Sequence, residues 1–220
     1  MTKSQIFQLY LSQNQIAPPE NLESILNWID ENKSISFFSW KMFKLGKPDF
    51  DTQEAAKFIG PEKKFVDLLK RLDIKFSYIK LIPDELPEYL YAKKFPDSVE
   101  FARQVRYFFS TTLIPAKCVL MSNLLKKPGM RKMYDFVFSE VCMNFTKLID
   151  KEKYNKEIKY RNSKSVAKKA FGLFAAESAV IYKYFKNPVL LAGQRSIDTY
   201  KYEFFKYPKN RPVLPKLFVI

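Results

Sequence analysis

The chain has 220 residues, of which 47% are hydrophobic and 28% are charged, and its 38 Lys and Arg against 23 Asp and Glu give a formal net charge of +15. This composition excludes a disordered chain, allows a sizeable buried core and indicates an anionic partner: nucleic acid, an anionic membrane surface or an acidic protein. Histidine is absent and glycine occurs only 5 times, which excludes imidazole chemistry and a glycine-rich phosphate cradle. We therefore expect no enzymatic activity and no catalytic residue.

The N-terminal region, residues 1–82, is predicted to be mainly helical. Asn21 can cap a helix whose apolar side chains recur at helical spacing: Leu22, Ile25, Leu26 and Ile29. The next segment, SISFFSWKMFKLG (34–46), is interpreted as a helix that ends at Gly46.

Two further helices and one strand are expected before residue 83. A short helix capped by Asp51 should end at Gly60–Pro61, and another should cover residues 62–72. Residues 75–83 alternate enough to form a strand, although one strand alone has no partner.

A proline-rich linker, residues 83–97, is predicted next, and its acidic pair Asp84–Glu85 is expected to face solvent. A helical, membrane-associated region should follow over residues 98–200, and an extended basic tail should cover residues 201–220. Three long helical segments are expected within 98–200: 98–125, interrupted by Pro115, 130–150, and 163 or 165 to 185. The predicted fold class is therefore mainly α.

Cys118 and Cys142 are the two cysteines of the chain. Two cysteines cannot build a disulfide framework, and without histidine they offer no zinc site. Both are expected to be reduced, buried thiols, and no metal site is expected. Nowhere do about 18 apolar residues follow one another without interruption, which excludes an ordinary free-standing transmembrane helix.

The least polar predicted helix, GLFAAESAVIYKYF (172–185), carries a carboxylate, Glu177, near its middle. Because a lone carboxylate in hydrocarbon costs about 3 kcal/mol, Glu177 should face a protein partner or be protonated. Lys168 and Lys169 precede the apolar turns, where long amine stems can reach lipid headgroups. Small residues beside Glu177 form a stripe that lets a second helix approach closely: Gly172, Ala175, Ala176 and Ala179. The same stripe is also compatible with close packing inside a soluble bundle.

Three stretches resemble subunit g of mitochondrial ATP synthase: RYFFSTTLIP (106–115), GLFAAESAVIYKY (172–184) and GQRSIDTY (193–200). The resemblance implies a non-catalytic accessory subunit of a mitochondrial inner-membrane complex, which supports assembly, dimerisation and membrane shaping through helix–helix contacts. It implies the other subunits of that large complex and anionic lipid as partners, with Glu177 facing a partner helix. No cofactor is implied apart from bound cardiolipin, whose headgroup would meet four basic residues: Arg106, Lys168, Lys169 and Arg195.

A basic helical protein that binds RNA or associates with the mitochondrial ribosome is the alternative. Its support is the positive charge and the interleaved aromatic and basic residues of KYNKEIKYRNSK (153–164) and YKYEFFKYPKNR (200–211). Nucleic acid is a partner in this alternative alone. A soluble helical scaffold is a third interpretation.

Overall fold

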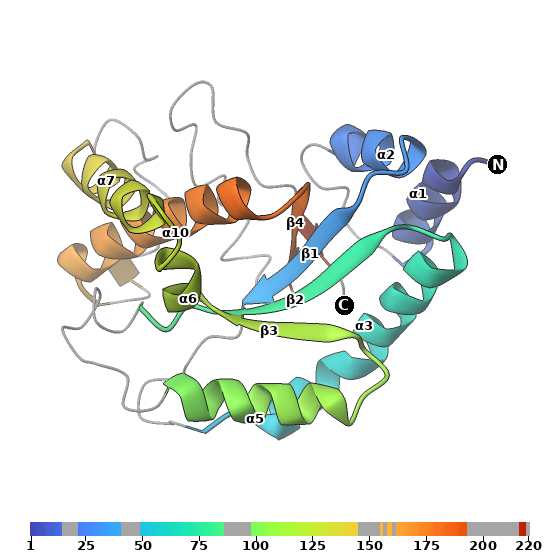
Figure 1. Ribbon diagram of the computed structural model, residues 1–220, viewed down its shortest axis with the longest axis horizontal. Helices are drawn as coiled ribbons and strands as arrows, with labels where there is room; N and C mark the ends of the chain where they lie inside the picture. Colours follow the sequence, from blue (N-terminus) through green and yellow to red (C-terminus); the bar gives the residue numbers. More distant parts are fainter. Residues whose placement is uncertain are drawn as a thin grey trace.

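The computed structural model spans residues 1–220 and describes residues 1–14, 22–40, 49–85, 98–144, 155, 158–159, 162–192 and 216–218. Its centre is a five-stranded sheet in which neighbouring strands are parallel (Figure 1). The strands lie in the order β3-β2-β1-β4-β5, and their bounds are Ile35–Trp40 (β1), Phe76–Ile82 (β2), Ala116–Leu120 (β3), Pro188–Ala192 (β4) and Lys216–Phe218 (β5).

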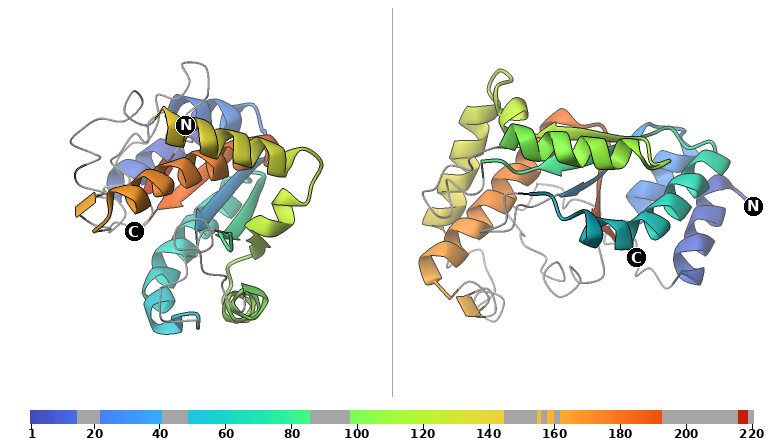
Figure 2. Two further views of the ribbon diagram at one scale, coloured as in Figure 1. Left: turned by 90° about the vertical axis from the view of Figure 1, so that its left-hand side faces the viewer. Right: turned by 90° about the horizontal axis from the view of Figure 1, so that it is seen from below.

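Helices cover both faces of the sheet. One face packs against α1 (Lys3–Gln13), α2 (Leu22–Asp30), α3 (Thr52–Arg71) and α5 (Ser98–Ser110). The opposite face packs against α6 (Met121–Leu125), α7 (Met130–Met143) and α10 (Lys164–Tyr184). Figure 2 shows α7 and α10 running side by side.

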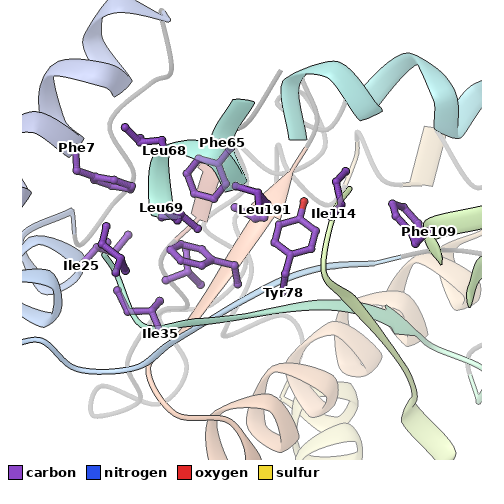
Figure 3. Packing of buried hydrophobic residues seen from close by; sticks show 14 of the residues in the cluster. Phe7, Ile25, Ile35, Phe65, Leu68, Leu69, Tyr78, Phe109, Ile114 and Leu191 are labelled. Carbon is purple, nitrogen blue, oxygen red and sulfur yellow. The ribbon is translucent and has the colours of Figure 1, made fainter. Parts of the chain in front are cut away.

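Each face of the sheet has its own hydrophobic core. Phe37 of β1 belongs to the core under α3 and α5, whereas its neighbour Phe38 belongs to the core under α7 and α10. Successive side chains of a strand point to opposite faces, so one short strand supplies both cores. Figure 3 shows Phe65 of α3 and Tyr78 of β2 in the first core together with Leu191 of β4.

The mainly α fold class is wrong, because the chain is an α/β protein built on a parallel sheet. Strands buried on both faces read as continuous apolar runs, without the alternation by which strands are recognised. The segment 34–46, interpreted as helix, contains strand β1, and the run PVLLA forms strand β4. The strand expected within residues 75–83 is present as β2, and β1 and β3 are the partners that it lacked.

Three other expected helices have different bounds. The helix expected to end at Gly60–Pro61 and the one expected over residues 62–72 are joined through Pro61 into a single helix, α3. Ile59 before Pro61 and Phe65 after it pack in the same core, which outweighs the backbone hydrogen bond that proline cannot make. The helical segment expected over residues 98–125 divides into α5, strand β3 and the short helix α6.

Strands from both sides of the proline-rich segment 83–97 belong to one sheet, since β1 pairs with β2 and with β4. Residues 86–97 lie outside the described residues, and the division of the chain at this segment stays a prediction. Within the tail, residues 216–218 form β5 beside β4, and the rest of 201–220 is not among the described residues. Within the described part of the chain, every helix is too short or too polar to cross a membrane.

Candidate functional site

The order of the strands identifies one edge of the sheet as the place for a ligand. The chain builds β1, β2 and β3 outward in one direction and then returns to add β4 on the other side of β1. In open parallel sheets, ligands bind beyond the carboxyl ends of the strands at the point where the order reverses. Ser39 is the next-to-last residue of β1 and therefore lies at this edge, between its neighbours β2 and β4.

A buried lysine stands directly beside Ser39. The parallel register places Ser39 of β1 opposite Lys80 of β2, and the Lys80 side chain is completely buried. Lys80 Nζ donates a hydrogen bond to Ser39 Oγ at 3.1 Å and another to Glu62 Oε2 at 2.6 Å. The rings of Tyr78 and Phe109 lie 4.7 and 4.4 Å from the ammonium group. The amine is therefore held by an acid, a hydroxyl and two aromatic faces.

The local sequence explains how this cluster forms. Tyr78, Lys80 and Ile82 alternate along β2 and so share the face that α3 covers. On α3, Glu62 is followed by Val66 and Leu69 at helical spacing, so the acid points toward the same interior. Burial in the first place, and then the Glu62 carboxylate, raise the pKa of Tyr78 well above its usual value.

Glu177 is a second buried acid, on the opposite face of the sheet. Its side chain is 1% exposed, and neither carboxylate oxygen has a hydrogen-bond partner among the described residues. Burial, reinforced by the nearby Asp84 carboxylate, raises the pKa of Glu177 to about 8. Asp84 follows the carboxyl end of β2, and its charge is the second cause of the raised pKa of Glu177, after burial.

Asp84 is hydrogen-bonded to the first turn of α6. Its Oδ1 accepts a hydrogen bond from the Ser122 backbone N–H at 2.9 Å, and burial raises its pKa although the Ser122 hydrogen bonds oppose the shift. Its neighbour Glu85 accepts a hydrogen bond from Arg131 of α7 at 3.0 Å. The expectation that this acidic pair faces solvent is therefore wrong, because both side chains are partly buried and bonded.

Gly172, the first residue of the small-residue stripe on α10, faces α7. A Cβ atom added to Gly172 would lie 2.8 Å from Phe138 Cδ2 and 2.9 Å from Cys142 Sγ, both on α7. Ala175 and Ala176 are buried, and Ala179 is partly buried. The neighbour of Gly172 thus belongs to the same chain, and a contact of the stripe with another subunit stays a prediction.

The basic residues predicted to bind lipid are not brought together. Arg106 is exposed on α5, and Lys168 and Lys169 are half-buried on α10, which covers the opposite face of the sheet. Arg195 lies outside the described residues. Binding of anionic lipid or cardiolipin by these residues remains a prediction.

Sequence reasoning missed Ser39, Glu62 and Lys80. The signal for Lys80 is a cation in an otherwise apolar strand, FSYIKLI, and the signal for Glu62 is an acid on the apolar side of a helix. Neither signal indicates that the two residues meet, because they lie on different elements 18 positions apart. Ser39 carried no signal, since its segment was interpreted as helix.

The comparisons with known proteins show the fold. No family model and no curated protein matches the sequence. The chain is similar in structure to a tryptophanyl-tRNA synthetase homolog from Entamoeba histolytica, with a TM-score of 0.60 and 12% identity over 96% of this chain and 54% of that one. It is also similar to tyrosyl-tRNA synthetase from Archaeoglobus fulgidus, solved with L-tyrosine, with a TM-score of 0.54 and 13% identity over 93% of this chain and 60% of that one.

A CDPS from Fluoribacter dumoffii gives a TM-score of 0.43 and 10% identity over 83% of this chain and 88% of that one, a similarity too low to argue from. The chain spans 54% and 60% of the two synthetase structures, so it corresponds to part of each. At these identities the likeness shows a shared Rossmann-like α/β fold.

The shared fold corrects four expectations. The resemblance to ATP synthase subunit g is wrong, because the structural neighbours are aminoacyl-tRNA synthetases and no family model supports it. The accessory-subunit function and the mitochondrial membrane role rest on that resemblance and are wrong for the same reason. The alternative, a basic helical RNA-binding protein, is not better supported, because the fold is α/β. The expectation of a non-enzyme is overturned, because the neighbours with this fold are enzymes.

Proposed function

We propose that the chain is an enzyme that binds the aminoacyl group of an aminoacyl-tRNA at the carboxyl edge of its parallel sheet. The observation that carries the proposal is Glu177, a fully buried carboxylate whose two oxygens have no hydrogen-bond partner in the described part of the chain. The fold supports it, because both synthetases with this fold act on amino acids by their names, and one was solved with L-tyrosine.

The chemistry of Glu177 fits the α-ammonium group of an amino acid. A buried carboxylate is costly unless a cation pairs with it, and burial, reinforced by the Asp84 charge, favours the protonated form of Glu177. An incoming ammonium group reverses this preference, since it draws the proton off Glu177 and forms a buried ion pair. The amino group of the aminoacyl moiety is the cation that every aminoacyl-tRNA carries.

An amino acid already esterified to tRNA suits this chain better than one activated by ATP. The sequence has neither histidine nor a glycine-rich phosphate-binding pattern. An aminoacyl ester needs no ATP, because its carbonyl is already activated. The formal charge of +15 favours association with a polyanion such as tRNA.

Ser39 is the candidate acceptor of the aminoacyl group. Its hydroxyl lies at the carboxyl end of β1 beside the Lys80 ammonium. Ser39 Oγ would attack the ester carbonyl carbon and form a new ester, as in other serine acyl transfers. The bond from that carbon to the ribose oxygen of tRNA breaks, and the leaving oxygen takes up the proton lost by Ser39. The proposal requires the amine site at Glu177 of α10 and the acceptor at Ser39 of β1, which belong to opposite faces of the sheet, to meet at its carboxyl edge.

The test is incubation of the purified protein with tRNAs charged with radiolabelled amino acids, followed by the rate of loss of the aminoacyl ester. We expect the wild-type protein to consume at least one aminoacyl-tRNA. Glu177→Gln should lower kcat/KM on the order of a hundredfold, since one partner of a buried charge pair is lost. The matched control is Glu23→Gln, at an exposed position of α2, which should keep wild-type activity.

Two outcomes would contradict the proposal. A folded wild-type protein that leaves every aminoacyl-tRNA intact has no such activity. Amino-acid-dependent exchange of pyrophosphate into ATP, without consumption of aminoacyl-tRNA, would instead make the chain an amino-acid-activating enzyme.

A further inference from the structure

The ion pair between Lys80 and Glu62 is buried, and burial of its two charges costs free energy. Lys80 is completely buried, and the side chain of Glu62 is 12% exposed. Withdrawal of two charges from water costs several kcal/mol per ion, and well-packed apolar residues of similar size commonly stabilise a core at least as well. Apolar and aromatic side chains of the described residues form the core on this face of the sheet, among them Phe65, Val66 and Phe109. Stability alone therefore does not explain why charges stand here.

Lys80 also contacts Ser39, which connects the ion pair to the carboxyl end of β1. Lys80 Nζ lies 3.1 Å from Ser39 Oγ, and Ser39 is the next-to-last residue of β1, close to the carboxyl ends of the strands. Because the ammonium group donates this hydrogen bond, it occupies a lone pair of Ser39 Oγ. The hydroxyl hydrogen of Ser39 must then point away from Lys80. A positive charge at this distance also stabilises negative charge that develops on the oxygen.

Glu62 and the aromatic rings keep the amine in place. Glu62 Oε2 accepts a hydrogen bond from Nζ at 2.6 Å, and the rings of Tyr78 and Phe109 stand within 4.7 Å of it. A lysine side chain has several rotatable bonds, so an unrestrained amine would not hold one hydroxyl in one orientation. Here the acid and the rings supply that restraint.

We propose that Lys80, clamped by Glu62, is a positioning residue that orients the Ser39 hydroxyl and stabilises charge on its oxygen. This inference rests on the proposed function in one respect, that Ser39 meets the substrate. Lys80 acts through Ser39 and does not itself contact the aminoacyl group.

The decisive experiment needs no tRNA. A fluorophosphonate probe reacts with polarised serines: the Oγ–P bond forms as the P–F bond breaks, fluoride leaves and the hydroxyl proton passes to solvent. We expect wild-type protein to be labelled at Ser39, as located by peptide mass spectrometry and by its loss in Ser39→Ala. In Lys80→Met/Glu62→Leu, which replaces the ion pair with apolar groups, the labelling rate should fall on the order of a hundredfold. Lys117→Met, at an exposed position of β3, is the matched control and should label at the wild-type rate.

The fold of each variant is followed by circular dichroism and thermal melting. If the apolar pair does not fold, Lys80→Gln/Glu62→Gln replaces it, because two amides keep hydrogen bonding without the charges. Equal labelling rates in a folded paired variant and the wild type would overturn the inference. Wild-type protein in which Ser39 stays unlabelled would overturn it as well.

The aminoacyl-tRNA assay separates this inference from the proposed function. If transfer occurs, the paired variant should lose about a hundredfold in the single-turnover rate of transfer to Ser39 at saturating aminoacyl-tRNA, with the half-saturating concentration nearly unchanged. The same double substitution in the Ser39→Ala background should cause no further loss, whereas additive losses would contradict a role through Ser39. If wild-type protein consumes no aminoacyl-tRNA but the probe still distinguishes the variants, the function fails and the role of Lys80 stands.

Discussion

Gly172 of α10 lies so close to Phe138 of α7 that a Cβ atom at Gly172 would come within 2.8 Å of Phe138 Cδ2. The same atom would lie 2.9 Å from Cys142 Sγ, one helical turn further along α7. The absence of a side chain at Gly172 thus sets how closely the two helices of this layer approach (Figure 2). Because α10 also carries Glu177, this contact helps to position the buried acid.

Substitution of Gly172 should destabilise the protein. Gly172→Ala forces Phe138 and Cys142 to move in a packed core, and overpacking of this kind costs about 1–3 kcal/mol. Urea denaturation followed by circular dichroism measures the change in the free energy of unfolding. The matched control is Gly60→Ala in α3, where an added Cβ has no heavy atom within 4 Å, and its effect should stay below about 1 kcal/mol. Equal effects at the two glycines would show that the α7–α10 contact is not tight.

The stability of the protein should depend on pH through Glu177. Burial and the Asp84 charge raise the pKa of Glu177 from 4.5 to about 8 in the folded protein, so the folded state holds its proton more tightly than the unfolded state. The contribution of this proton is complete below about pH 4.5 and is lost as the pH rises through 8, a change on the order of 5 kcal/mol. Unfolding free energies of wild type and Glu177→Gln between pH 5 and 9, a range set by this linkage, test it, since the variant should remove the decline.

The Lys80–Glu62 ion pair should respond differently to single and paired substitution. Lys80→Met alone leaves the Glu62 carboxylate buried without its cation, and Glu62→Leu alone leaves the ammonium without its acid. Each should cost about 3–5 kcal/mol, whereas the paired change should be nearly neutral or stabilising. Thermal and urea unfolding of the three variants form a double-mutant cycle. A paired variant as unstable as the sum of the single variants would contradict a direct interaction.

Cys118 should react slowly as long as the protein is folded. Burial raises the pKa of the Cys118 thiol to about 11, although the nearby Arg106 charge opposes the shift. Because the thiolate is the reactive form, alkylation at pH 8 should be on the order of a hundredfold slower than for an unfolded thiol. Iodoacetamide labelling of Cys142→Ala, which leaves Cys118 as the single thiol, measures this rate with and without urea. Equal rates in both conditions would contradict the protected environment.

The sequence predicted several local features of this fold. The helix expected from residue 163 or 165 to 185 is present as α10, which begins at Lys164 and ends at Tyr184, and the strand expected at 75–83 is β2. Helical spacing in one case and alternation in the other are local patterns that neighbouring residues determine. Glu177 is buried within its own chain, and burial raises its pKa. The contact of Glu177 with a partner helix of another subunit stays a prediction.

The candidate site depended on information that no local pattern holds. Ser39, Glu62 and Lys80 come from β1, α3 and β2, and each looks ordinary in its own segment. Ser39 and Lys80 meet because the parallel register places them opposite each other. This register can be predicted only if residues 35–40 are first identified as a strand. An apolar run such as ISFFSW is compatible with a buried helix and with a buried strand. Because it is interpreted as a helix from the sequence, neither the parallel sheet nor the candidate site is predicted.

Composition and spacing by themselves determined the positive charge, the absence of histidine chemistry, the amphipathic helices and the cost attached to Glu177. The tertiary structure alone decided that β1 lies between β2 and β4, that Gly172 packs on α7 and that Lys80 is shared by Glu62 and Ser39. The physical reason is the range of the interactions. Helix periodicity acts within a few residues, whereas strand order and side-chain pairing join positions far apart in the chain, which become neighbours only when the sheet forms.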